Sequence, residues 1–316
     1  MAAASLLLLG AAAWLALELS PRGPVSRGIE VLALSSAGRW IASGTAAGQV
    51  RIWHLGRPQT VREVHETNGH LNDLQFDPNE EYLAVANKNI TLVPLLSPNP
   101  TRVIRGDQAN YGTVRFTADG QSLLTINGRG AILAIEISTG KAHQKACCST
   151  IYGEVALSPD DSLIFGAGHW PAVWSFRSGN LISRLTAARE FLAFAPIAID
   201  GNKNLLYMGN QDGRVYVWDL RTRQFLHTSK AQPGYVRTIA VLGNSGWIAY
   251  AALGGAVRLW NPETEESRVV PAARTTSNLA FDHSHHRTAL GTDSGQIELW
   301  DLIEGKLLST LPPSDH

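Results

Sequence analysis

The stretch Gln49-Val50-Arg51-Ile52-Trp53 alternates small or apolar side chains with polar ones and ends in a bulky aromatic residue. The same pattern returns as Arg214-Val215-Tyr216-Val217-Trp218, as Ala256-Val257-Arg258-Leu259-Trp260 and as Gln296-Ile297-Glu298-Leu299-Trp300, and weaker copies end at Val93, Ile135 and Trp174. A period of two is typical of a β-strand. The intervals between successive end residues are 40, 42, 39, 44, 42 and 40 residues. The chain therefore contains seven copies of one repeat.

A repeat of this length corresponds to one four-stranded blade of a β-propeller. About twenty residues before each end residue, an apolar run, a polar turn and a second apolar run follow one another, as in Val155–Leu157, Ser158–Asp161 and Leu163–Phe165. Such turn residues favour a hairpin. We predict an all-β fold, a seven-bladed β-propeller of four-stranded antiparallel blades over residues 28–312, with a short tail over 313–316. The apolar first strands, such as 236–242, are expected to be innermost and the alternating third strands half-buried nearer the rim.

The dipeptides Trp218-Asp219 and Trp300-Asp301, the relaxed versions Trp53-His54 and Trp260-Asn261, and the dipeptide Gly69-His70 resemble the WD-repeat family. The resemblance implies structural roles for Ser43, Trp53, His70, Trp174, Asp212, Trp218, Asp219, Trp260, Trp300 and Asp301. The family commonly ties a blade with a hydrogen-bonded set of His, Ser or Thr, Asp and Trp, but no blade of this chain has all four. We therefore expect apolar stacking between blades to supply most of the stability.

Ring closure is a second departure from the family, in which a strand from the N-terminus often completes the last blade. Here the seventh repeat has four strands of its own, the last over Lys306–Leu311, and the chain enters the ring near Ile29. We expect the seventh blade to pack on the first without an interlocking strand.

The N-terminus differs from the repeats. Residues 2–17 are uncharged, with Ser5 as the one polar side chain, and residues 20–27 resemble a linker. A short apolar helix over residues 1–19 can be a membrane anchor, a cleaved signal peptide or a soluble extension. An anchor is favoured because signal peptides normally begin with a basic residue. Since Arg22 and Arg27 follow the apolar run, the predicted location is a membrane-anchored protein with its propeller in the cytoplasm. A secreted or periplasmic protein and a soluble cytoplasmic one are the alternatives.

Composition argues against several functional classes. Lys plus Arg and Asp plus Glu both number 27, so no net charge attracts nucleic acid. The adjacent pair Cys147-Cys148 provides no disulfide framework. The cluster His283-Ser284-His285-His286 aligns with polar hairpin turns of other repeats, and neither a nucleophile elbow nor a phosphate-binding loop is present. We expect no enzyme activity, no cofactor and no metal.

The resemblance implies a scaffold that binds a protein or peptide on one face of the disc. Together with the apolar run at the N-terminus, this predicts a membrane-tethered scaffold that is monomeric by itself. That face consists of the loops between second and third strands and of the links between blades. Its aromatic, Arg, His and Asp residues are Tyr111, Arg129, Tyr152, His169, Trp170, Arg189, Asp212, Tyr235 and Arg274. Aromatic and Arg side chains are common interface anchors, and Trp170 is the first choice because Pro171 follows it. Each Tyr can instead pack over its neighbouring blade.

A small ligand or an ion in the central channel is the alternative function. It needs polar side chains that converge from the inner strands, and the sequence of those strands contains few.

Overall fold

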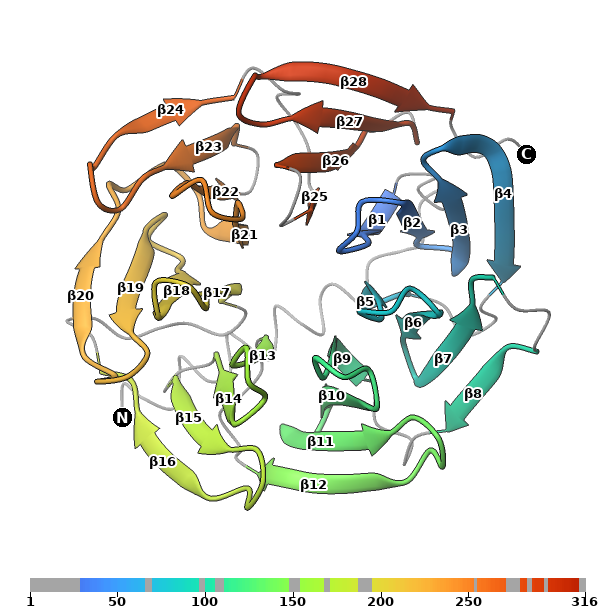
Figure 1. Cartoon of the computed structure of the whole chain (residues 1–316), viewed down its shortest axis with the longest axis horizontal. Helices are drawn as coiled ribbons and strands as arrows, with labels where there is room; N and C mark the ends of the chain where they lie inside the picture. Colours follow the sequence, from blue (N-terminus) through green and yellow to red (C-terminus); the bar gives the residue numbers. More distant parts are fainter. Residues whose placement is uncertain are drawn as a thin grey trace, which may run out of the picture.

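A computed structural model describes residues 29–65, 70–96, 100–105, 111–147, 154–167, 171–186, 195–252, 255–270, 279–282, 286–292 and 295–312. Seven four-stranded antiparallel sheets stand around a central axis (Figure 1). The predicted seven-bladed propeller is confirmed. The predicted N-terminal helix, the linker over 20–27 and the tail over 313–316 lie outside the described residues.

The strands follow one another through the blades in chain order. Blades 1 to 3 contain β1 (Ile29–Leu34), β2 (Trp40–Thr45), β3 (Gln49–His54), β4 (Arg57–His65), β5 (Asp73–Phe76), β6 (Tyr82–Ala86), β7 (Asn89–Pro94), β8 (Arg102–Arg105), β9 (Tyr111–Phe116), β10 (Ser122–Asn127), β11 (Ala131–Glu136) and β12 (Ala142–Cys147). Blades 4 and 5 contain β13 (Val155–Leu157), β14 (Leu163–Gly166), β15 (Ala172–Ser175), β16 (Leu181–Arg184), β17 (Ile197–Asp200), β18 (Leu205–Gly209), β19 (Val215–Asp219) and β20 (Phe225–Thr228). Blades 6 and 7 contain β21 (Val236–Val241), β22 (Ile248–Ala252), β23 (Val257–Trp260), β24 (Ser267–Val269), β25 (Leu279–Asp282), β26 (Arg287–Gly291), β27 (Ile297–Asp301) and β28 (Lys306–Leu311).

Within each blade the first strand is innermost and the fourth forms the rim (Figure 1). The third strands agree with the prediction in part: β3, β23 and β27 alternate between buried and partly buried residues, whereas β7, β15 and β19 are buried almost throughout. In β19, Val215 and Val217 pack toward blade 6, whereas Tyr216 and Trp218 pack toward blade 4. The period of two in β19 therefore separates two buried surfaces, one for each neighbouring blade. Among the described residues, a rim strand such as β24 is exposed along its whole length.

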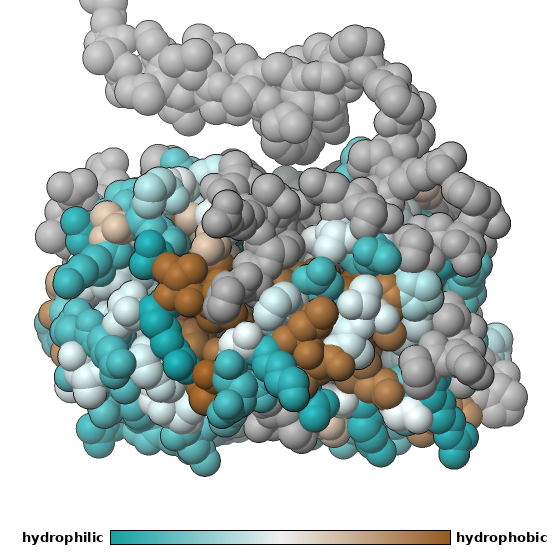
Figure 2. All heavy atoms as spheres, turned by 90° about the horizontal axis from the view of Figure 1, so that it is seen from above, coloured by the Kyte–Doolittle hydropathy of each residue, from teal (hydrophilic) through white to brown (hydrophobic). Residues whose placement is uncertain are grey.

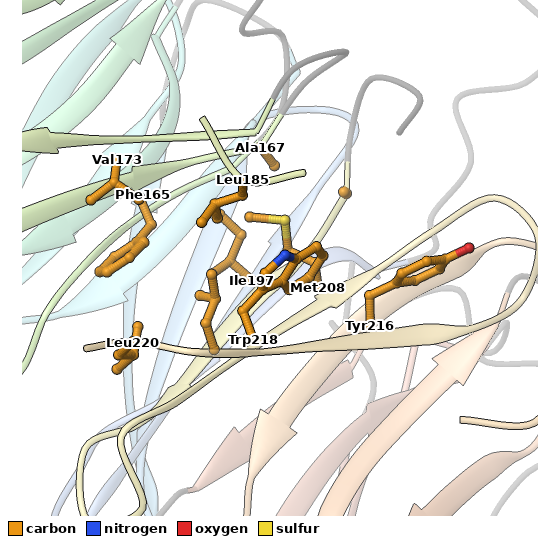
Figure 3. Packing of buried hydrophobic residues seen from close by; sticks show 11 residues of the cluster. Phe165, Ala167, Val173, Leu185, Ile197, Met208, Tyr216, Trp218 and Leu220 are labelled. Atoms are coloured by element: carbon orange, nitrogen blue, oxygen red, sulfur yellow. The ribbon is translucent and has the colours of Figure 1, made fainter. Parts of the chain in front are cut away.

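Apolar clusters join the blades, one cluster at each of the seven junctions between described residues. Figure 3 shows the cluster between blades 4 and 5, where Trp218 lies beside Leu185, Ile197 and Met208. The seven repeat-end residues follow one rule, since each packs against the blade that precedes its own. The expected apolar stacking between blades is present at every junction.

Blade 7 meets blade 1 through the same kind of contact. β28 is the fourth strand of blade 7, and β1 is the innermost strand of blade 1. Ile29, Ile41 and Trp53 of blade 1 share a cluster with Leu299 and Leu311 of blade 7. In the described part of the chain, the ring is closed by this apolar contact.

Hydrogen bonds and ion pairs of the repeat residues run both between blades and within them. The indole N–H of Trp218 donates to the carbonyl of Thr186 in blade 4 at 3.3 Å. The imidazole of His70, at the start of blade 2, lies 3.2 Å from Glu30 of blade 1. Within blade 5, Asp212 accepts a hydrogen bond from the hydroxyl of Tyr216. The structural roles that the resemblance implies for the repeat residues stay a prediction.

Candidate functional site

The turns between second and third strands and the links between blades lie on one face of the ring, which we call the link face. Five predicted partner-binding residues of this face lie outside the described residues: Tyr152, His169, Trp170, Arg189 and Arg274. Four lie within them: Tyr111, Arg129, Asp212 and Tyr235. The described part of the link face is continuous at blades 5 and 6, where the β18–β19 turn (210–214) and the link from β20 to β21 (229–235) meet.

This turn and this link hold each other through their backbones. The amide of Gln232 donates to the carbonyl of Gly213 at 3.0 Å, and the amide of Val236 donates to that of Asn210 at 3.1 Å. Gly213 has a φ of +74°, and a Cβ atom there would lie 1.8 Å from the carbonyl oxygen of Gln232. A glycine is therefore required by both the left-handed backbone and the close approach. The two segments form one fixed platform.

Asp212 stabilises the platform from inside. Its carboxylate accepts hydrogen bonds from the hydroxyl of Tyr216 at 2.8 Å and from the amide of Arg214 at 3.2 Å. The guanidinium of Arg214 donates to the carbonyl of Ser229, at the start of the link, at 3.0 Å. Asp212 is thus engaged within the turn, and its contact with a partner stays a prediction.

Tyr235 presents an exposed ring beside the platform. Arg237 of β21 lies against this ring. The guanidinium carbon of Arg237 is 5.9 Å from the centre of the Tyr235 ring, and one guanidinium nitrogen is 3.5 Å from the Tyr235 hydroxyl. Residue Tyr235 is 36% exposed, and Arg237 is exposed as well. An aromatic ring in cation–π contact with an arginine is a small, ordered surface that offers both apolar area and positive charge.

Tyr111 and Arg129 lie on other blades. Tyr111 is 3% exposed and belongs to the apolar cluster between blades 2 and 3, so it packs over its neighbouring blade. Arg129 is exposed in the β10–β11 turn, where its amide donates to Asn127. Of the four described residues, the structure therefore brings only Asp212 and Tyr235 together.

A charged cluster on the channel wall was missed by sequence reasoning. Arg115 of β9 lies 2.6 Å from the carboxylate of Asp73 of β5 and 3.6 Å from that of Glu154, which precedes β13. Asp73 also accepts the amide of Val114 at 3.0 Å, and Glu154 accepts the amide of Ile197 at 3.1 Å. The cluster joins the inner strands of blades 2, 3, 4 and 5.

The surroundings shift the pKa values of Glu154 and Arg115. Burial raises the pKa of Glu154, although the neighbouring Arg115 opposes the shift. Burial by itself would lower the pKa of Arg115, but the carboxylates of Asp73 and Glu154 raise it overall. Because its charges are paired with each other and with backbone amides, the cluster acts as a tie between blades. A polar site for a channel ligand would need free donors or acceptors.

The three charged residues of this cluster occupy the same position in their repeats, and this could have been seen in the sequence. Asp73, Arg115 and Glu154 each lie twenty residues before the residue that ends their repeat, which is Val93, Ile135 or Trp174. In the part of the chain that the structure describes, no three His, Cys, Asp or Glu side chains gather as metal ligands. Residues 283–285 of the histidine turn and Cys148 lie outside that part.

Comparison with known proteins finds similarity to WD-repeat proteins. A model described as "WD domain, G-beta repeat" matches residues 20–54. Mouse transducin beta-like protein 3 is 28% identical over 49% of this chain and 20% of its own length. WD repeat-containing protein 55 of Arabidopsis thaliana is 21% identical over 68% of this chain and 62% of its own. The target of rapamycin complex subunit wat1 of Schizosaccharomyces pombe is 20% identical over 55% and 57%. The chain thus spans only about a fifth of the first of these relatives.

The predicted membrane-anchored location is wrong. No helix in the described ranges is long and apolar enough to cross a membrane, and the similarity to WD-repeat proteins such as transducin beta-like protein 3 gives no support to a tether. The apolar residues 2–19, on which the prediction rested, lie outside those ranges. An apolar run by itself does not distinguish a membrane segment from one that is buried against protein.

Proposed function

The chain is a WD-repeat β-propeller, and from this premise we propose that it is a non-catalytic scaffold that binds a protein or peptide on its link face. One similar protein, the target of rapamycin complex subunit wat1, is by name a subunit of a complex, which supports a role in assembly. The equal numbers of basic and acidic residues favour a protein partner over nucleic acid.

The pair Tyr235–Arg237 beside the 210–214 and 229–235 platform carries the proposal. Tyr and Arg are the residue types that most often dominate binding energy at interfaces. Backbone hydrogen bonds fix the platform before a partner arrives, so little ordering is required on binding. The pair suits a partner that offers an apolar side chain to the ring and a carboxylate to the guanidinium. Tyr152, His169, Trp170, Arg189, Arg274 and Arg129 remain predicted extensions of the same face.

Substitution on the two faces of one blade pair tests this proposal. The double variant Tyr235→Ala/Arg237→Glu removes the link-face pair, and Arg221→Glu changes an exposed residue in the β19–β20 turn on the opposite face. Partners are first identified by quantitative affinity purification of the full chain and then measured in purified form by calorimetry. We expect the double variant to weaken binding by about thirtyfold or more, as for a hot-spot pair, and Arg221→Glu to leave it unchanged. Equal binding by all three chains refutes the proposed face.

A further inference from the structure

The outer rim of the ring differs in charge from blade to blade. In blades 3 and 4, the fourth strand and the turn before it cover residues 137–147 and 176–184. These two stretches contain no Asp or Glu, and their basic residues are Lys141, His143, Lys145, Arg177 and Arg184. The corresponding stretch of blade 6, residues 261–269, contains three Glu and one Arg. Although the whole chain has no net charge, positive charge is therefore concentrated on one side of its rim.

Exposed apolar side chains occur on rim strands of both kinds. Figure 2 views the ring from the side of β24 and β28 and shows apolar side chains there between hydrophilic ones. Val269 of β24 is 49% exposed, and Leu181 and Ile182 of β16 are 53% and 42% exposed. What distinguishes β16 from β24 is thus the sign of the charges beside its apolar residues.

A groove lies between the rims of blades 3 and 4, and the strand register defines its two walls. Residues directly opposite each other in an antiparallel sheet share a face. His143 lies opposite Ala134, which packs toward blade 4, and Leu181 and Arg184 lie opposite residues of β15 that pack toward blade 3. We call this the rim groove, with His143 and Lys145 on the wall of blade 3 and Leu181 and Arg184 on the wall of blade 4.

A cavity of about 320 Å³ belongs to the rim groove, and its lining includes His143 and Lys145 of β12 and Phe176 of the β15–β16 turn. The ammonium nitrogen of Lys145 lies 4.8 Å from the centre of the Phe176 ring. A Cβ atom on Gly179 would lie 2.0 Å from the carbonyl oxygen of Lys145. The turn of blade 4 therefore packs directly on β12, and this contact holds the two walls of the rim groove in a fixed arrangement.

Glu136 is the acidic residue that lines the same cavity. Its carboxylate accepts hydrogen bonds from the hydroxyls of Thr139 at 2.8 Å and Ser138 at 2.9 Å, both in its own turn. These hydrogen bonds lower the pKa of Glu136, so it stays a carboxylate that is engaged within that turn. The basic residues of the two rims outnumber it, and the net charge around the rim groove is positive.

We propose that the rim groove binds an extended acidic segment of a partner protein. Carboxylates of the segment pair with Lys145 and Arg184 on the two walls, and an apolar side chain packs on Leu181. Among the described strands, none pairs with the outer edge of β16, so the backbone of the segment can extend the sheet of blade 4.

The exposed apolar residues of β16 favour a protein over nucleic acid as the occupant. Leu181 and Ile182 are aliphatic, whereas the bases of a single strand stack on aromatic side chains. The rim groove is separate from the link face, so the acidic-segment proposal and the proposed function of the pair Tyr235–Arg237 can fail independently.

Charge reversal on both walls tests the proposal. The probe is a capped peptide of about ten residues in which valine and glutamate alternate, because alternate side chains of an extended strand share a face. Lys145→Glu/Arg184→Glu reverses one charge on each wall, and Lys88→Glu/Lys306→Glu is a matched control that reverses two exposed charges elsewhere. We expect the first variant to weaken binding of the probe to the full chain by about tenfold or more, and the control variant to bind like the natural chain. Calorimetry at physiological ionic strength measures both.

Failure of the natural chain to bind the probe overturns the proposal, as does equal binding of a peptide with lysine in place of glutamate. Equal weakening in the two double variants means that net charge attracts the probe, which also overturns it. Tighter binding of oligothymidylate or of phosphatidylserine vesicles than of the probe, lost in Lys145→Glu/Arg184→Glu, assigns the rim groove to nucleic acid or to a membrane and rejects an acidic protein segment.

Amide hydrogen exchange of the unsubstituted chain is a second measurement that does not depend on the folding of a variant. The bound probe should slow exchange in residues 181–184 of β16 and leave residues 267–269 of β24 unchanged. Equal slowing in both strands, or no slowing in β16, contradicts binding at the rim groove.

Discussion

Gly213 shows how one residue sets the geometry of the candidate binding face. Its backbone lies in the left-handed region, and its α-carbon lies where any side chain would strike the carbonyl of Gln232. Gly246, in the turn between β21 and β22, has nearly the same φ of +78°, but a Cβ atom there would meet only the ends of Asn261 and Lys203 at 3.5 Å. The two glycines therefore share the same backbone conformation, but only Gly213 is in close contact with the backbone of another segment.

Replacing each glycine by alanine measures how much the close contact at Gly213 contributes to the free energy of unfolding. We expect Gly246→Ala to lower the free energy of unfolding by about 1–2 kcal/mol, the cost of a left-handed alanine. Gly213→Ala should lower it by roughly 1–3 kcal/mol more, because the turn and the link must also move apart. Urea denaturation of both variants provides the comparison. Equal losses would mean that the platform yields easily and that it is not fixed before binding.

Repeat spacing predicted which residues end each repeat, but not what they contact. Trp218 and Trp300 were assigned from their position, and both lie in the third strand of a blade as expected. The acceptor of the Trp218 indole is a carbonyl in another blade, about thirty residues earlier. A backbone carbonyl leaves no trace in the side-chain pattern, so this tie could not be predicted from the sequence.

Inner strands are joined by the Asp73–Arg115–Glu154 cluster, and its stability should depend on pH. Burial raises the pKa of Glu154, so the folded chain binds a proton there more tightly than the unfolded chain. The contribution of Glu154 to stability is therefore full at a pH below the ordinary glutamate pKa. It is lost as the pH rises through the raised value in the folded state.

The variant Glu154→Gln tests that dependence, because glutamine keeps an acceptor for the amide of Ile197 but does not titrate. We expect the unfolding free energy of the natural chain, minus that of the variant, to fall as the pH rises from about 4 to about 7. Denaturation at several pH values measures it. A constant difference would show that the pKa of Glu154 is not raised.

Element positions were largely predictable, and element environments were less so. The hairpin turns at Asp77–Glu80 and Ser158–Asp161 stand between first and second strands, as their turn residues indicated. The third strands were expected to be half-buried, because alternation usually separates core from solvent. β3, β23 and β27 alternate in this way, but β7, β15 and β19 are buried almost throughout. In a ring of blades both faces of a sheet are covered, so the alternation in β19 distinguishes two neighbours instead. Local sequence cannot report which surfaces a later repeat will cover.

At the scale of the whole ring, closure rests on the contact between blades 7 and 1. Ile41 and Ile52 lie on adjacent strands of blade 1, both 1% exposed or less, but Ile41 packs toward blade 7 and Ile52 toward blade 2. Ile41 therefore reports on the junction that closes the ring, between blades 7 and 1, and Ile52 reports on the junction between blades 1 and 2.

Replacing either isoleucine by alanine should lower the stability by about 2–5 kcal/mol, the cost of a large cavity. We expect Ile41→Ala to speed amide hydrogen exchange in β25–β28 and Ile52→Ala to speed it in β5–β8. The measurement is hydrogen exchange with mass spectrometry at matched stability. If both variants loosen the same blades, the ring is not closed in solution by the contact seen here.

Because each repeat-end residue packs against the blade before its own, the direction of synthesis matters. A chain that leaves the ribosome N-terminus first always finds the receiving surface for Val93, Ile135, Trp174, Trp218, Trp260 and Trp300 already made. Trp53 alone must wait, since its surface belongs to blade 7. The blades can therefore fold in order during translation, each packing onto a neighbour that has already formed. The face of blade 1 that carries Trp53 stays exposed, and available to chaperones, until the last blade is synthesised.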